Sequence, residues 1–157
     1  MNLQEFWRAI QLSVRAGAGA GLSAAVALQF HLKYPIYAFL AAVIVTDLSP
    51  SRTRHLGWMR LVTTMVGAGI GVLLCRVLPP GPLALGIGVL IAMQVCHFVH
   101  LQEGAKVAGY ICGIVLLEYG AEAGAYAFFR LIETALGIVV AMLISYVPKL
   151  IRVDGQE

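Results

Sequence analysis

The chain consists mainly of apolar runs that are separated by short polar segments, and this pattern limits its possible folds more than any other feature. Only 12% of its 157 residues are charged, whereas charged residues make up about 25% of an ordinary soluble domain. A soluble core of this size hides few such runs, so the sequence predicts an all-α integral membrane protein. The runs that qualify as helices cover about residues 13–32, 36–48, 57–78, 82–100, 105–119 and 124–147.

Six runs predict six transmembrane helices, because about 20 helical residues cross the hydrocarbon core. The runs at 36–48 and 105–119 are short, so they must borrow flanking residues, lie inside the bundle or fail to cross fully. Residues 3–14 place apolar side chains at helical spacing among polar ones. This pattern predicts a short N-terminal amphipathic helix in the membrane interface.

The distribution of basic residues predicts the orientation. Six crossings place the N-terminus and the segments 48–56, 101–105 and 148–157 on one side of the membrane. That side holds Arg8, Arg15, Arg52, Arg54, Lys106, Lys149 and Arg152, and the other side holds Lys33 and Arg76. The positive-inside rule therefore predicts that both termini of this multi-pass protein lie in the cytoplasm. We expect the bacterial inner membrane as its location.

Two stretches of the sequence resemble one another at an offset of 70 residues. Arg60 opens R-L-V-T-T-M-V-G and Arg130 opens R-L-I-E-T-A-L-G. We predict that residues 1–157 form a single membrane domain made of two three-helix repeats, 13–78 and 82–147. Three helices are an odd number, so the second repeat enters the membrane from the opposite face, as in many transporters.

Each of these stretches aligns small residues with its arginine on one helix face. Arg60, Thr64, Gly67 and Gly71 stand at i, i+4, i+7 and i+11. The spacing i, i+4 and i+7 recurs at Arg130, Thr134 and Gly137. Small residues mark close helix contact in membranes, so Gly67, Gly71 and Gly137 are predicted packing residues and the arginines face protein or a wet cavity.

Two interpretations of the arginines follow. In the first, Arg60 and Arg130 are positive charges at opposite ends of an anion path. In the second, Arg60 extends to the cytoplasmic interface or pairs with Asp47, and Arg130 pairs with Glu133. Glu133 occupies the position that Thr63 holds in the first repeat. Glu133 and Asp47 are also candidates for coupling transport to protons.

Two parts of the sequence resemble the fusaric acid resistance protein-like family of aromatic acid exporters, whose superfamily includes the plant aluminium-activated malate transporters. They are "YPIYAFLAAVIVTDLSPSRTR", which is followed by an arginine-led helix with threonine and glycine, and the second arginine-led helix, "RLIETALGIVVAMLISYVPK". The resemblance covers about residues 8–150. Family members usually carry R-x-x-G-T-x-x-G in these helices, and here Thr63 and Glu133 replace the first glycine. The resemblance implies a six-helix domain that assembles as an oligomer and moves organic anions past basic helix residues.

We therefore expect a homo-oligomeric membrane transporter that exports small organic anions such as aromatic carboxylates. Arg60 and Arg130 would attract the carboxylate, and Thr64 and Thr134 would offer hydroxyl hydrogen bonds. The alternatives are an anion channel and a non-transporting scaffold or accessory subunit of a larger complex. The last alternative draws on the small size of the chain, which stops at Glu157 without the cytosolic domain that many relatives add. The expected partners are membrane lipid and the anion. We expect no catalytic residue, cofactor, metal or nucleic acid.

Overall fold

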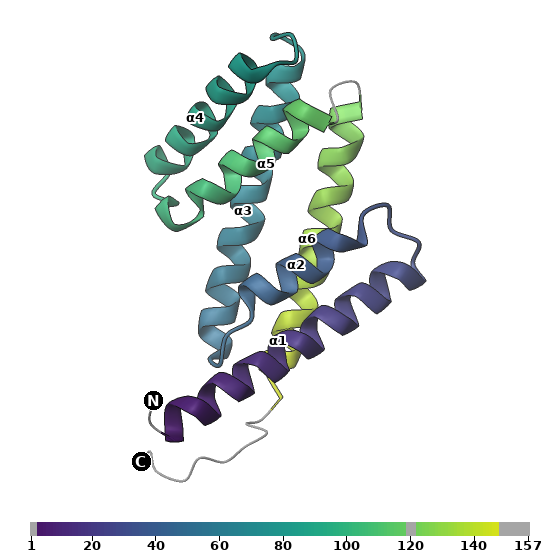
Figure 1. Cartoon of the computed structure of the whole chain (residues 1–157), viewed down its shortest axis with the longest axis vertical. Coiled ribbons are helices and arrows are strands. Elements are labelled where there is room, and N and C mark those ends of the chain that lie inside the picture. Colours follow the sequence, from purple (N-terminus) through teal and green to yellow (C-terminus); the bar gives the residue numbers. More distant parts are fainter. Residues whose placement is uncertain (1–2, 119–121, 148–157) are drawn as a thin grey trace. The chain divides into compact units, whose positions relative to one another are not determined.

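The computed structural model describes residues 3–118 and 122–147 (Figure 1). Within these ranges it contains six α-helices, one short 3-10 helix and no β-strand. The elements are α1 (Leu3–Gln29), α2 (Pro35–Val45), α3 (Pro50–Cys75), α4 (Pro82–Phe98), η1 (Gln102–Gly104), α5 (Ala105–Glu118) and α6 (Ala123–Ser145). The all-α prediction is confirmed. Lys149, Arg152 and the predicted cytoplasmic C-terminus lie outside the described residues.

Three of the helices begin at a proline, which explains why their starts are sharp. Pro35, Pro50 and Pro82 are the first residues of α2, α3 and α4. Proline lacks a backbone N–H, but the first N–H groups of a helix have no partner inside the helix, so nothing is lost there. Its fixed φ also suits the first helical position.

The predicted separate amphipathic helix at the N-terminus is wrong, because α1 is one helix from Leu3 to Gln29. Its buried face continues across the predicted break at residue 13. Every fourth residue lies on this face, namely Gln11, Arg15, Gly19, Ser23 and Ala27. No proline interrupts the segment, and a glycine inside a helix weakens it by only about 1 kcal/mol. One continuous packed face therefore keeps the two parts together.

Two of the described helices are long and apolar enough to cross a membrane, α3 with 26 residues and α6 with 23. Helices α2 and α4 are apolar but shorter. The 11 residues of α2 extend over about 16 Å at 1.5 Å per residue, against about 30 Å for the hydrocarbon core. The number of crossings and the inverted orientation of the two halves stay predictions.

The chain packs as two compact units. Unit 1 comprises residues up to Gly57 together with those from Glu133 onward, and unit 2 comprises Trp58–Ile132. In unit 1, α1 packs along α2. In unit 2, α4 packs along α5. The limits of the units fall inside α3 and α6, so these units are not the predicted repeats, whose bounds 13–78 and 82–147 stay a prediction.

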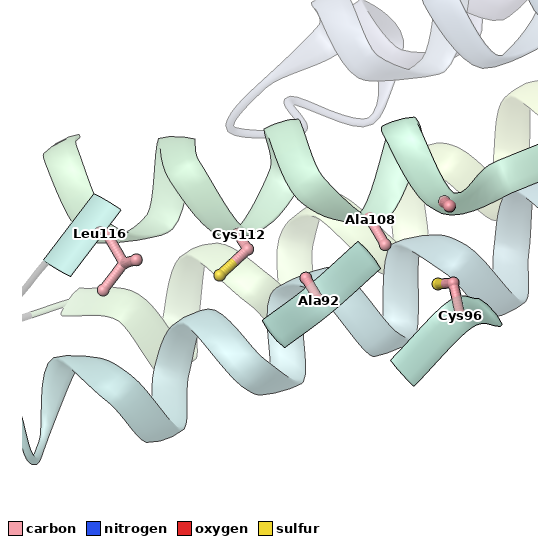
Figure 2. Close-up of a cluster of buried hydrophobic side chains, with 6 residues drawn as sticks. Ala92, Cys96, Ala108, Cys112 and Leu116 are labelled. Atoms are coloured by element: carbon pink, nitrogen blue, oxygen red, sulfur yellow. The ribbon is translucent and has the colours of Figure 1, made fainter. Parts of the chain in front are cut away.

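The core cluster of unit 2 consists mostly of small side chains of α4 and α5, and partly buried side chains of α3 pack against it. Figure 2 shows Ala92 and Cys96 of α4 facing Ala108, Cys112 and Leu116 of α5, all of which are buried. Small side chains permit a close approach of two helices, which is the means of helix association in a membrane.

Helices α1 and α4 end in turns of the same kind, and this similarity was not predicted. His31 has φ 51° and His100 has φ 58°, both in the left-handed region. The next residue in each case is a leucine, whose N–H donates to a carbonyl five residues earlier, at 2.9 Å in the first turn and 2.8 Å in the second. This is the hydrogen bond of a Schellman C-cap, with histidine in the place that glycine usually takes. The two turns are 69 residues apart.

Close helix contacts also recur, at an offset of 70. In unit 2, a Cβ built on Gly67 would lie 2.8 Å from the Cα of Ala108. In unit 1, a Cβ built on Gly137 would lie 3.0 Å from the carbonyl carbon of Ala38. Thus α3 meets α5 and α6 meets α2, each at a glycine where the backbones touch. The third helix of each predicted repeat packs on the second helix of the other.

Candidate functional site

The two arginines that head the repeated motif lie together in unit 2. Arg60 is 5% exposed and Arg130 is 1% exposed. The guanidinium carbon of Arg60 lies 5.5 Å from the centre of the Tyr110 ring, and that of Arg130 lies 5.7 Å from the same centre. The prediction that these arginines stand at opposite ends of a path is therefore wrong. They share one aromatic side chain and form one site.

Three helices supply this site, which we call the Tyr110 cluster: Arg60 from α3, Tyr110 from α5, and Tyr126 and Arg130 from α6. Tyr126 and Arg130 are one helical turn apart, so their side chains meet on one face. The Arg130 Nη1 donates a hydrogen bond to the Tyr126 hydroxyl, and its guanidinium carbon lies 5.7 Å from that ring centre. Both rings lie within the distance at which an aromatic face attracts a cation.

The cluster places positive charge in the interior of unit 2. The Nε and Nη1 atoms of Arg60 are buried and have no hydrogen-bond partner in the protein. The acids of unit 2 are Glu103, Glu118 and Glu122, and all three are exposed. A buried cation is costly unless it is paired and hydrogen-bonded. The arrangement therefore attracts an anion to Arg60, and the burial of this side chain disagrees with the interpretation in which it extends to the membrane interface.

Thr64 lies one turn from Arg60, but its hydroxyl is already used as a donor. Its Oγ1 donates to the Arg60 carbonyl at 2.7 Å, and Thr63 donates in the same way to the Met59 carbonyl at 2.8 Å. A threonine hydroxyl has one hydrogen and two lone pairs, so in this arrangement Thr64 can only accept. Thr134, the corresponding residue of α6, is buried in unit 1.

The two acids that are candidates for proton coupling lie in unit 1 and hold backbone groups there. Glu133 Oε1 accepts a hydrogen bond from the N–H of Tyr34, just before α2, at 2.6 Å. A carboxylate is stabilised at the start of a helix, where the dipole is positive. Asp47 Oδ1 accepts the N–H of Ser49 at 3.0 Å, and the Asp47 N–H donates to Thr53 Oγ1 at 3.0 Å. Both side chains thus have structural partners, and proton coupling stays a prediction.

Arg15 is an interior residue, although its place in the sequence predicts only one of the cytoplasmic charges. It is 3% exposed. Its Nη1 donates to the Leu48 carbonyl at 3.0 Å and its Nη2 donates to the Val147 carbonyl at 2.9 Å. Arg15 thereby joins α1 to the loop after α2 and to the segment that follows α6. The four-residue spacing of polar and small residues along α1 was the signal that could have identified it.

Tyr110 was also missed, and no local pattern identifies it. It lies on an apolar helix at a position that only the packing of α3, α5 and α6 brings to the arginines. Within the described residues, no three His, Cys, Asp or Glu side chains gather as ligands of a metal ion would.

Comparison with known proteins agrees with the predicted family. The family model described as "Aromatic acid exporter family member 1" matches residues 11–147. A UPF0421 protein of Staphylococcus haemolyticus is 27% identical over 138 residues, which are 86% of this chain and 41% of that protein. A UPF0421 protein of Staphylococcus epidermidis is 28% identical over 116 residues, which are 72% of this chain and 35% of that protein.

The chain thus spans less than half the length of these curated relatives. No solved structure matches it. The family model nevertheless covers both arginine-led helices, the Tyr110 cluster and the glycine contacts of both units. The chain therefore belongs to the aromatic acid exporter family, a family of membrane exporters.

Proposed function

We propose that the chain is a membrane transporter that exports small organic anions, in particular aromatic carboxylates, and that the anion binds at the Tyr110 cluster. The observation that carries this proposal is the buried guanidinium of Arg60, two of whose nitrogens have no partner in the protein. It shares the Tyr110 ring with a second buried arginine. Family membership supports the direction of transport and the class of substrate.

The chemistry of the site fits a carboxylate. A guanidinium and a carboxylate are both planar, and charge-assisted hydrogen bonds between them are about twice as strong as neutral ones. A carboxylate that reached Arg60 would satisfy its buried donors and offset its charge. A carboxylate that enters the site loses its hydrogen bonds to water. The site therefore selects anions whose oxygens accept hydrogen bonds from the guanidinium instead.

The setting we propose is the bacterial inner membrane, with both termini in the cytoplasm and several copies of the chain assembled together. Large apolar side chains on the outside of the helices support this setting. Phe98 is 81% exposed, Leu83 is 78% exposed and Trp58 is 64% exposed. Side chains of this kind suit contact with lipid or with a second copy. In this setting, movement of the two predicted repeats against each other would give alternating access.

The test is transport by purified protein in proteoliposomes. Uptake and efflux of labelled benzoate and of a panel of aliphatic carboxylates would be measured with and without a pH gradient, for the wild type, Arg60→Gln and Arg130→Gln. Arg54→Gln is the matched control, because Arg54 lies on the same helix as Arg60 and loses the same charge, but is exposed. We expect saturable benzoate flux that both cluster variants abolish and that the control retains.

Other outcomes would indicate other functions. Flux that does not saturate and does not respond to the gradient would indicate an anion channel with the same binding site. Absence of carboxylate flux from folded wild-type protein, or equal flux in all four proteins, would refute transport through the cluster. A non-transporting subunit of a larger complex would then be the better explanation.

A further inference from the structure

Tyr110 has an unusual position. Its ring lies against both buried arginines, yet it is the most exposed residue of the Tyr110 cluster. The side chain is 41% exposed, against 5% for Arg60 and 1% for Arg130. Two guanidinium groups within reach of one ring repel each other. An aromatic face carries a partial negative charge and attracts a cation. The ring of Tyr110 therefore opposes the repulsion between the two arginines.

Comparison of the two halves of the sequence shows that the fold alone does not require an aromatic residue at this position. Helices α2 and α5 bury the same positions at an offset of 70: α2 buries residues 38, 41, 42 and 45, and α5 buries 108, 111, 112 and 115 among others. The position that corresponds to Tyr110 holds Leu40, and the position that corresponds to Tyr126 holds Leu56. Each half thus has its arginine, but only the second half has the rings.

We propose that Tyr110 is a positioning residue, whose ring holds Arg60 and Arg130 together as a single anion-binding pair. This inference rests on the proposed function, because it names the residue that prepares the site for the anion. The ring keeps both guanidinium groups turned toward one place when the site is empty. A bound carboxylate then meets two oriented donors, and less ordering is needed at the moment of binding.

The experiment compares Tyr110→Phe with Tyr110→Leu in the full chain. Phenylalanine keeps the aromatic face and loses only the hydroxyl, and leucine is the residue found at the corresponding position 40. Thermal unfolding in detergent is measured first in anion-poor buffer, for both variants alone and in combination with Arg60→Gln and with Arg130→Gln. Binding of benzoate is then measured by titration calorimetry.

We expect Tyr110→Leu to lower the melting temperature by about 2–6 °C, as the loss of one or two cation–π contacts implies for a chain of this size. This loss should be smaller when Arg60 or Arg130 is already glutamine. Benzoate affinity should fall about tenfold in Tyr110→Leu and less than about twofold in Tyr110→Phe. Recovery of affinity with phenylalanine would assign the effect to the ring.

Three results would overturn the inference. Additive melting temperatures would mean that the ring does not act on the arginines. Coupled melting temperatures with unchanged benzoate affinity in Tyr110→Leu would mean that the ring stabilises the fold but does not position the site. If the wild type binds no benzoate, the proposed function fails, and coupled melting temperatures would then show that the ring serves stability instead.

Discussion

The contact between α3 and α5 at Gly67 leaves no room for a methyl group, so Gly67→Ala should destabilise unit 2. The added Cβ would lie 2.8 Å from the Cα of Ala108, whereas carbon atoms in contact prefer about 3.5–4.0 Å. The two helices would have to separate by about 1 Å at this point. Overpacking of this kind costs about 1–3 kcal/mol, and the gain of alanine over glycine inside a helix offsets about 0.5–1 kcal/mol of it.

Gly69→Ala is the matched control for this prediction. Gly69 lies on the same helix, and a Cβ there would meet nothing within 4 Å. It should therefore show only the gain in helix propensity, so the free energies of unfolding of the two variants should differ by about 1–3 kcal/mol. The measurement is equilibrium unfolding in mixed micelles, followed by circular dichroism.

Equal stability of Gly67→Ala and Gly69→Ala would refute the close approach of α3 to α5. The corresponding change on the other side, Gly137→Ala, offers an independent check. A Cβ there would lie 2.9 Å from the Cβ of Ala41, and we expect a loss of similar size. A large loss at one glycine and none at the other would show that the two contacts are not equivalent.

Three further substitutions have defined outcomes. Glu133→Gln should retain most of the stability, because its amide oxygen still accepts the hydrogen bond from the Tyr34 N–H. Glu133→Ala should lower the free energy of unfolding by about 1–3 kcal/mol in the same assay. Equal losses in the two variants would mean that this hydrogen bond is unimportant. Arg15→Gln should lower the free energy of unfolding by about 1.5–3 kcal/mol for each charged hydrogen bond that it breaks. Unchanged protease resistance of the variant would contradict a stabilising role of the hydrogen bonds from Arg15 to the Leu48 and Val147 carbonyls. Ser145→Ala should cost about 0.5–1.5 kcal/mol through its 2.8 Å hydrogen bond to Thr53, and the same cost in a Thr53→Val background would show that the bond contributes nothing.

The helices could be predicted from the sequence because their determinants are local. Apolar runs and prolines at helix starts are read within a few residues, and each of the six predicted runs overlaps an α-helix. The start of α1 was misplaced because an amphipathic segment and an apolar segment have different compositions, but the same face of the helix is buried in both. The continuous stripe from Gln11 to Ala27 depends on packing against α2, which composition does not reveal.

The candidate site was predicted only in part for the same reason. Spacing identified Arg60 and Arg130 as inward-facing, and both are buried. Their distance from one another depends on where α5 lies between α3 and α6, and no repeat in the sequence gives that position. Only the packing of these helices shows that Tyr110 belongs to the site, since a tyrosine on an apolar helix is equally consistent with a position at the membrane interface.

The recurring contacts separate the parts of the molecule that serve folding from those that need another explanation. A feature that both halves share, such as the histidine turns after α1 and α4 or the glycine contacts of α3 and α6, would be sufficiently explained by the predicted three-helix repeat. A feature present in one half alone is not. The rings of Tyr110 and Tyr126 belong to this second group, because leucines occupy the corresponding positions. Both halves carry an arginine, but only the second half carries the rings, and the ring of Tyr110 lies against both arginines. The function is therefore expected at this one arginine pair.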